Sequence, residues 1–163
     1  EKSGKNLAYI YPDGTKIMPH VIEPTFGLSR AITVVMMNAY HEESIPATTE
    51  GGMQKSRVVM KFPKHIAPIK ASIFALQKDE KLQGLAIDIY NNLRKNFECE
   101  YQDSGNIGKM YRRQDEIGTP YCVTIDYQSL EDNMVTVRDR DTMAQERVSV
   151  KSLETYLKEN IGL

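Results

Sequence analysis

Little net charge, few cysteines and the lack of any long apolar run limit what this 163-residue sequence encodes. Lysine and arginine number 21 and aspartate and glutamate 22, so the formal net charge is −1. A nucleic-acid partner would therefore have to be held by a local basic patch. No apolar run is long enough to cross a bilayer. The first residues have neither a methionine start nor the apolar segment of a signal peptide, so we expect a cytoplasmic fragment or processed chain with no membrane partner.

The sequence also lacks the residue spacing of a metal site. The three histidines, His20, His41 and His65, lie far apart and share no ligand spacing with Cys99 or Cys122. We therefore predict no zinc or other metal site. Both cysteines lie in segments that resemble strands, and we expect reduced thiols that pack as small hydrophobic side chains.

What is present is the composition of a folded protein, with 40% apolar and 26% charged residues. Asp13-Gly14 separates Leu7–Tyr11 from Thr15–Glu23, which predicts a hairpin of two antiparallel strands. Leu28–Tyr40 is apolar almost all round and predicts a buried helix. Glu42–Ser56 mixes proline, glycine, threonine and charge without periodicity, which indicates a loop and a domain boundary.

Beyond Arg57 the pattern alternates between strands and helices. The mostly apolar run Ile66–Leu76 is typical of a parallel strand covered on both faces. Asp79 is a candidate N-cap for the next helix. Further strands are expected at 98–102, 119–126, 133–138 and 144–150, and helices at 82–97, at the end of 103–118 and at 153–161. This order, roughly βαβαβββα, predicts an α/β fold with a mixed sheet of about five strands and about three helices.

The first candidate site is the corner His20–Arg30. A predicted strand ends at Glu23, the chain turns, and Arg30 lies on the first turn of the following helix. A guanidinium group there can bind a phosphate through two parallel hydrogen bonds, and Glu23 can hold an ammonium group. The alternative is a surface ion pair at a strand–helix corner.

The second candidate is the glycine-containing turn and basic helix of Asp103–Gly118. Arg112 and Arg113 would hold a nucleotide backbone or base, or the stretch is an ordinary turn followed by a solvated helix. The third is Arg138–Arg147, where arginine and aspartate alternate. Arginine recognises guanine, and aspartate or glutamate accepts from the amino group of cytosine, so this stretch would read bases. The alternative is a solvated ion-pair turn that adds little stability.

Together these stretches resemble the glycyl-tRNA synthetase family. His20–Arg30 resembles motif 3 of a class II aminoacyl-tRNA synthetase in the form found in that family. Asp103–Gly118, Val123–Asp126 and Arg138–Met143 resemble its anticodon-binding domain, in the homodimeric type of enzyme. The resemblance runs from about Tyr9 to Leu157. It implies the end of a catalytic domain at 1–41, a linker at 42–56 and an anticodon-binding domain at 57–163.

The resemblance also implies a reaction and its residues. Glycine attacks the α-phosphate of ATP, supplied with Mg²⁺, and the glycyl group then moves to the 3′ end of tRNA(Gly). By resemblance Arg30 is catalytic and contacts the ATP phosphates, and Gly27 lines the ATP site. Glu23 binds the glycine ammonium group, and Thr25, where serine is usual, lines the same pocket.

The resemblance assigns anticodon binding to two groups of charged side chains. The glycine anticodon ends in two cytosines, whose amino groups suit carboxylate acceptors, while arginines hold phosphates or stack on bases. The candidates are Arg112, Arg113, Asp115, Glu116, Arg138, Asp139, Arg140, Asp141 and Arg147. Motifs 1 and 2 are not recognisable here, so the chain alone is expected to be inactive and to bind no cofactor tightly.

Two other interpretations stay open from the sequence. One is a non-catalytic nucleic-acid-binding accessory module with a synthetase-like fold, against which the presence of Glu23 and Arg30 argues. The other is a small-molecule α/β binding domain whose charged stretches are only solvated surface. A tRNA-binding titration distinguishes this last interpretation from the others.

Overall fold

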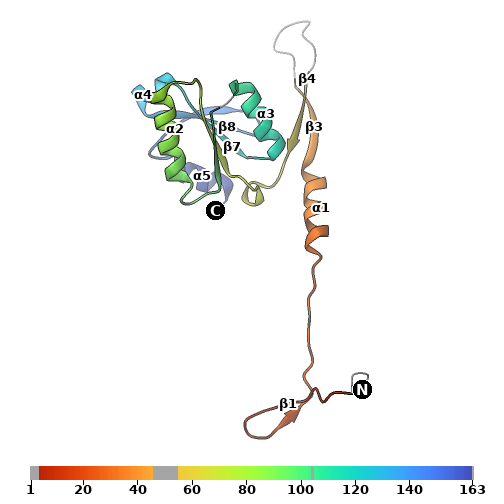
Figure 1. The fold of residues 1–163 in the computed structure, drawn as a ribbon. Helices are drawn as coiled ribbons and strands as arrows, with labels where there is room; N and C mark the ends of the chain where they lie inside the picture. The colour runs from red at the N-terminus through yellow and green to blue at the C-terminus, as the bar shows by residue number, and fades with distance from the viewer. Residues whose placement is uncertain (1–3, 46–54, 104, 163) are drawn as a thin grey trace. The chain divides into compact units, whose positions relative to one another are not determined.

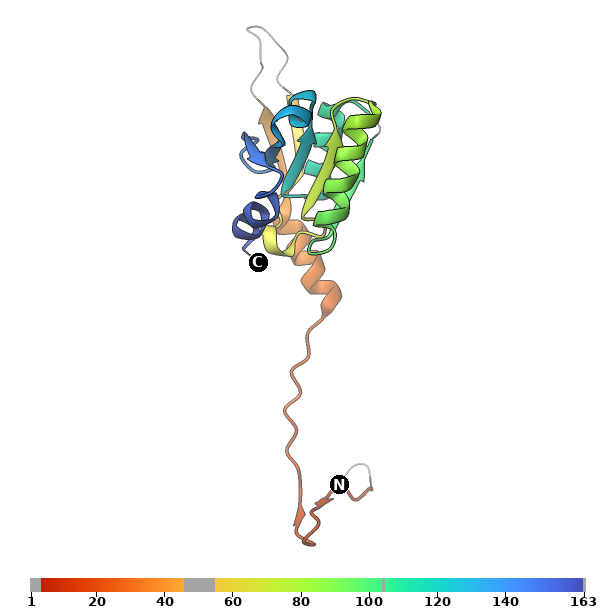
Figure 2. The same ribbon diagram turned by 90° about the vertical axis from the view of Figure 1, so that its left-hand side faces the viewer.

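The structure is a computed structural model that describes residues 4–45, 55–103 and 105–162 (Figures 1 and 2). Its chain divides into two units, residues 1–31 and residues 32–163. The expected division into 1–41, 42–56 and 57–163 stays a prediction.

The first unit contains the predicted hairpin in a shorter form. Strands β1 (Tyr9–Ile10) and β2 (Lys16–Ile17) pair antiparallel, with Tyr9 opposite Ile17. Gly14 takes φ +84° in the turn, a conformation that glycine adopts without strain. The hairpin is therefore confirmed. The strand prediction is wrong from residue 18 to Glu23, because this stretch has no regular structure and no partner strand within the described residues.

Helix α1 (Leu28–Ala39) confirms the predicted helix but not its burial. Ala39 is its only buried residue, while the side chains of Leu28 and Met37 are 73% and 74% exposed. In this chain the helix therefore presents an apolar surface to solvent.

Strands β3 (Tyr40–Ile45) and β4 (Lys55–Met60) form an antiparallel pair with Tyr40 opposite Met60. The loop predicted for 42–56 is therefore wrong at 42–45 and 55–56, and its middle lies outside the described residues. The sequence of β3 is polar and gives no strand pattern. The strand is held in place by its pairing with β4 and by an ion pair between Glu43 and Arg57.

The main sheet has five strands in the order β6-β5-β7-β8-β9, which confirms the predicted mixed sheet. Strand β5 (Ala71–Ala75) runs parallel to β6 (Cys99–Gln102) and β7 (Tyr121–Ile125). Strands β8 (Met134–Asp139) and β9 (Gln145–Ser149) follow antiparallel. All five residues of β5 are buried, as predicted for a parallel strand covered on both faces. The strand is shorter than predicted because a 3₁₀ turn at Lys64–Ile66 and then Pro68 precede it.

Helices cover both faces of the sheet (Figures 1 and 2). Helices α2 (Glu80–Leu93) and α5 (Leu153–Ile161) pack on the face that carries the main hydrophobic core. The Asp79 side chain accepts hydrogen bonds from the backbone of Lys81 and Leu82, which confirms the predicted N-cap. The short helix α4 (Tyr127–Asp132) was not predicted.

Helix α3 (Ile107–Ile117) lies on the opposite face, over a much smaller apolar cluster of Phe74, Met110 and Cys122. Cys99 and Cys122 are free, as expected, and burial raises the pKa of each thiol to about 12. Because the apolar contact under α3 is small, polar side chains supply much of the packing on this face.

Candidate nucleic-acid interface

Helix α3 is defined at both ends by local chemistry. Gly105 takes φ +110° in the preceding turn, and the Asn106 side chain caps the helix by accepting from the Lys109 backbone N–H at 2.9 Å. Gly118 ends it in the left-handed conformation, and its N–H donates to the Gln114 carbonyl. The predicted turn and helix are thus confirmed. Within the helix, Met110, Gln114 and Asp115 are buried.

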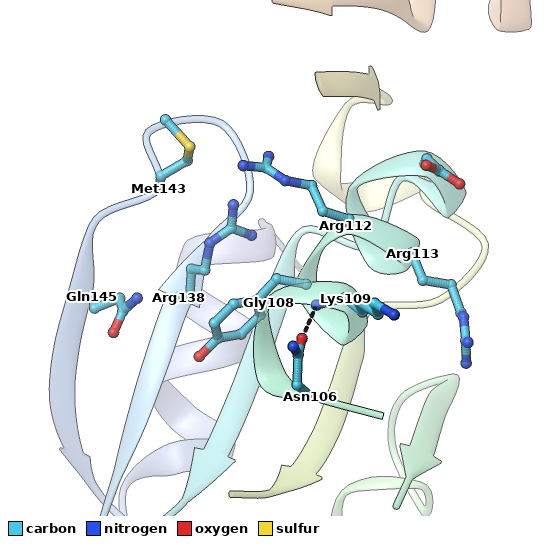
Figure 3. A pocket seen from close by; sticks show the side chains of 10 residues that line it. Asn106, Gly108, Lys109, Arg112, Arg113, Arg138, Met143 and Gln145 are labelled. Carbon is cyan, nitrogen blue, oxygen red and sulfur yellow. Dashed lines mark hydrogen bonds between the residues drawn. The ribbon is translucent and has the colours of Figure 1, made fainter. Parts of the chain in front are cut away.

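A pocket of about 680 Å³ opens between α3, β8, the turn after β8 and β9 (Figure 3). It is lined by Asn106, Gly108, Lys109, Tyr111, Arg112, Arg113, Glu116, Arg138, Met143 and Gln145. Four of these side chains are cationic and one is anionic. Figure 3 shows Arg112 and Arg138 extending toward a common space from α3 and β8, whereas Arg113 points away from Arg138. We call this space the α3 pocket.

Next to the α3 pocket, one fully buried carboxylate, that of Asp115, pairs with three arginines. Arg138 donates to both oxygens of Asp115, at 2.8 and 3.1 Å. Arg57 donates to Oδ2 at 3.2 Å, and Arg112 reaches the same oxygen at 3.4 Å. Since Asp115 is 0% exposed, its carboxylate faces the protein interior. This corrects the expectation that it is open to a base.

Arg138 forms a flat element of the pocket wall. Its guanidinium carbon lies 4.9 Å from the centre of the Tyr111 ring, within cation–π range. The Tyr111 and Thr124 hydroxyl groups share a hydrogen bond of 2.7 Å, which fixes the orientation of the ring. Burial would lower the pKa of Arg138, but the Asp115 carboxylate raises it overall, so the side chain stays charged.

Arg57 was not singled out from the sequence. Its side chain is fully buried and joins three parts of the fold, because it binds Glu43 at 2.6 Å, Asp115 at 3.2 Å and the Arg140 carbonyl at 2.9 Å. These partners are 14, 58 and 83 residues away in sequence. In the structure Arg57 lies directly opposite Glu43 in the β3–β4 pair, so only a prediction of this strand pair could have indicated its role.

The arginine–aspartate alternation after β8 builds an ion-paired turn in which the arginine at the centre, Arg140, is buried. Arg140 is 2% exposed and donates to the carbonyls of Gly118 and Phe62, both at 2.8 Å. Its guanidinium also pairs with Asp141 at 2.8 Å. The Asp139 side chain accepts from backbone N–H groups within the turn and from Lys64 at 2.6 Å. Arg140 is therefore not open to a base, whereas the anticodon roles of Asp139 and Asp141, whose side chains are 19% and 33% exposed, stay predictions.

Arg147 is held elsewhere, between Asp126 and Asp132, each at 2.8 Å. It is not among the residues that line the α3 pocket. Of the nine predicted anticodon residues, four therefore line this pocket: Arg112, Arg113, Glu116 and Arg138.

A family model described as "Anticodon binding domain" matches residues 66–160, which is more than half of the chain. The chain belongs to this family. Every residue that lines the α3 pocket lies inside the matched part of the anticodon-binding domain.

Curated relatives of the whole chain are glycine–tRNA ligases. Those of Clostridium acetobutylicum and Thermobifida fusca are 47% and 46% identical to it over 99% of the chain. That of Corynebacterium efficiens is 48% identical over the same share. The chain spans only about a third of the length of these relatives, 33%, 35% and 35%. The predicted family resemblance is confirmed.

Solved structures agree on the fold of the anticodon-binding domain. The prolyl-tRNA synthetase of Cryptosporidium parvum matches 63% of this chain, and 22% of its own, with a TM-score of 0.59 at 17% identity, which shows the fold alone. The RNA binding domain of threonyl-tRNA synthetase from Cryptosporidium parvum Iowa II matches 61% of this chain, and 25% of its own, with a TM-score of 0.55 at 25% identity.

The residues predicted to bind glycine and ATP lie in the first unit, outside the family match. Glu23, Thr25, Gly27 and Arg30 are all exposed. Arg30 lies on the first turn of α1, as predicted, and its Cδ would lie 3.6 Å from a Cβ added at Gly27. Their roles stay predictions. In the described ranges no group of three metal-ligating side chains occurs, and no described helix is long and apolar enough to span a membrane.

Proposed function

We propose that this chain is part of a glycine–tRNA ligase and that its α3 pocket binds the anticodon loop of tRNA(Gly). One observation carries the proposal: a pocket with four cationic side chains lies wholly inside the matched anticodon-binding domain. The identity of about 47% to glycine–tRNA ligases supports glycine as the amino acid of the whole enzyme.

The side chains of the α3 pocket divide naturally between two tasks. Lys109 and Arg113 are exposed and can neutralise loop phosphates, which supply affinity without sequence information. Arg138 is 4% exposed and stacks on Tyr111, so it contributes a fixed positive charge at the pocket wall, next to where a splayed base would enter. Glu116 is the exposed carboxylate of the pocket and can accept a hydrogen bond from a cytosine amino group.

The ligase reaction belongs to the whole enzyme in this proposal. ATP, supplied with Mg²⁺, and glycine meet at the site to which Glu23, Thr25, Gly27 and Arg30 contribute. The Arg30 guanidinium binds ATP phosphates and the Glu23 carboxylate holds the glycine ammonium group. The enzyme acts as a cytoplasmic homodimer. Support for these roles comes from the sequence resemblance and from the exposure of these side chains.

A titration of the chain with fluorescent anticodon stem–loop RNAs tests the proposal. Each mismatched base in a specific site typically costs about 1–3 kcal/mol, so replacing both anticodon cytosines by uracil is expected to weaken binding by at least tenfold. Glu116→Gln is expected to reduce this preference, because an amide presents an N–H donor as well as an oxygen. Equal affinity for the two RNAs would contradict the proposal and favour a partner other than the anticodon.

A further inference from the structure

We propose that Arg57 and Asp115 are positioning residues for RNA binding: they fix the Arg138 guanidinium in the wall of the α3 pocket without touching the RNA themselves. This inference rests on the proposed function of the pocket. It assigns a role to Arg57, which lies outside the residues matched by the family model.

The first step is the fixed plane of Arg138. Asp115 accepts from both terminal nitrogens of Arg138, at 2.8 and 3.1 Å, so the guanidinium cannot rotate without losing a bond. The Tyr111 ring lies along it at 4.9 Å. A binding group that is already held in its bound orientation costs less entropy when the ligand arrives.

The second step is how Asp115 itself is held. Asp115 projects from α3, which has little apolar packing beneath it. Arg57 binds its Oδ2 at 3.2 Å and is fixed on its other side by Glu43 at 2.6 Å. Arg57 also donates to the Arg140 carbonyl at 2.9 Å, in the turn that continues from β8. One buried side chain thus ties α3 and the end of β8 to the β3–β4 pair.

The third step is charge. Three guanidinium groups share the Asp115 carboxylate, and Glu43, which also pairs with Lys61, supplies a second anion to Arg57. Arg57 is therefore partly neutralised from behind, and the cluster as a whole keeps an excess of positive charge beside the pocket that Arg112 and Arg138 line. Arg112, whose side chain is 40% exposed, presents this charge to solvent, and the buried Arg138 adds to it from the pocket wall.

A double-mutant cycle tests the inference with the same stem–loop RNAs. Arg138→Lys keeps the charge but loses the flat fork, and Arg57→Met removes the buried anchor. Each single variant is expected to bind the cytosine-containing RNA about fivefold to tenfold more weakly, and the double variant no more weakly than Arg138→Lys alone. Losses that multiply in the double variant would show that Arg57 does not act through Arg138, and would overturn the inference.

A charge-matched control is Arg94→Met, which removes a cation at the C-terminus of α2 that lies 5.3 Å from the Tyr90 ring. Its RNA affinity is expected to stay within about twofold of the parent chain, since it contacts neither the pocket nor the buried cluster. A loss equal to that of Arg57→Met would attribute the effect to net charge and contradict positioning.

Arg57→Met removes a partner of a buried carboxylate, so its fold is checked by circular dichroism and thermal unfolding. If it does not fold, Glu43→Gln replaces it in the cycle, because this change weakens the pairing of Arg57, and of Lys61, while leaving every buried charge at Asp115 in place. If Glu43→Gln weakens RNA binding in the parent chain but not in the Arg138→Lys variant, the inference is supported. If it weakens RNA binding by the same factor in both, the inference is overturned. If the parent chain shows no preference for cytosine, the proposed function fails, and the coupling between residues 57 and 138 still decides the positioning role.

Discussion

Gly118 illustrates how one residue supports the α3 pocket from a distance. It ends α3 at φ +90°, and its carbonyl accepts from Arg140 at 2.8 Å. A Cβ at this position would lie 2.5 Å from the Phe62 ring and 2.8 Å from the Met60 carbonyl oxygen. The site therefore excludes every side chain for two reasons, the backbone conformation and the lack of space.

Gly118→Ala is expected to lower the free energy of unfolding by roughly 2–4 kcal/mol, the sum of left-handed strain and overpacking. Gly162→Ala is the matched control, because Gly162 also ends a helix, at φ +80°, but has no atom within 4 Å of an added Cβ. It should lose only about 1 kcal/mol. Urea unfolding of both variants measures the difference, and equal losses would show that the contact with β4 and Phe62 costs nothing.

At the scale of an element, the turn after β8 depends on a titratable side chain. The Asp139 carboxylate accepts from the backbone N–H groups of Asp141 and Thr142, at 2.8 and 2.9 Å, and from Lys64 at 2.6 Å. Burial alone would raise the pKa of Asp139, but Lys64 and these N–H groups hold it below its ordinary value. The same turn carries Met143, which lines the α3 pocket.

Because the folded pKa of Asp139 is depressed, its stabilisation is complete above the ordinary aspartate pKa and is lost as the pH falls through the folded pKa. Asp139→Asn is expected to be about 1–2 kcal/mol less stable than the parent chain at neutral pH. This difference in the free energy of unfolding should persist down to about pH 4 and disappear below it. Urea unfolding at stepped pH measures it, with the exposed Asp88→Asn as the control. A stability difference that does not change with pH would contradict the role of the carboxylate charge.

Elements with a strong local pattern were predictable. Val135 and Val137 point into the core from β8, as their alternation indicated, and the apolar stripe of α2 is buried as expected. Helix α4 was missed because it has six residues, although Asp126 and Ser129 form a capping box that the sequence displays. The β3–β4 pair was missed because its strands lack apolar alternation.

The candidate site was predictable only as a region. The sequence located charged residues in α3 and after β8, but not which of them are buried. Asp115 and Arg140 carry charges that normally lie at the surface, and the structure buries both. Their partners come from β4, β8 and the segment before β5, at separations of up to 83 residues. Local spacing carries no information about such contacts.

For the whole molecule, the balance of charge determines how RNA binding should depend on salt. The chain has 21 lysines and arginines against 22 aspartates and glutamates, so its overall field does not attract RNA. Many of its arginines are already paired with carboxylates inside the fold. The cations of the α3 pocket that reach solvent are Lys109, Arg112 and Arg113. Binding should therefore release few counterions.

With about three phosphate contacts to a single-stranded loop, the slope of log affinity against log salt concentration is expected to be about −2. Affinity should then fall roughly tenfold to twentyfold between 50 and 200 mM salt. Arg113→Gln should reduce the slope by about 0.7, since it removes one phosphate contact. Lys158→Gln, which removes a cation paired with Glu154 on α5, should leave it unchanged. A slope several times steeper, or one that Arg113→Gln does not alter, would show that the RNA is held mainly outside the α3 pocket.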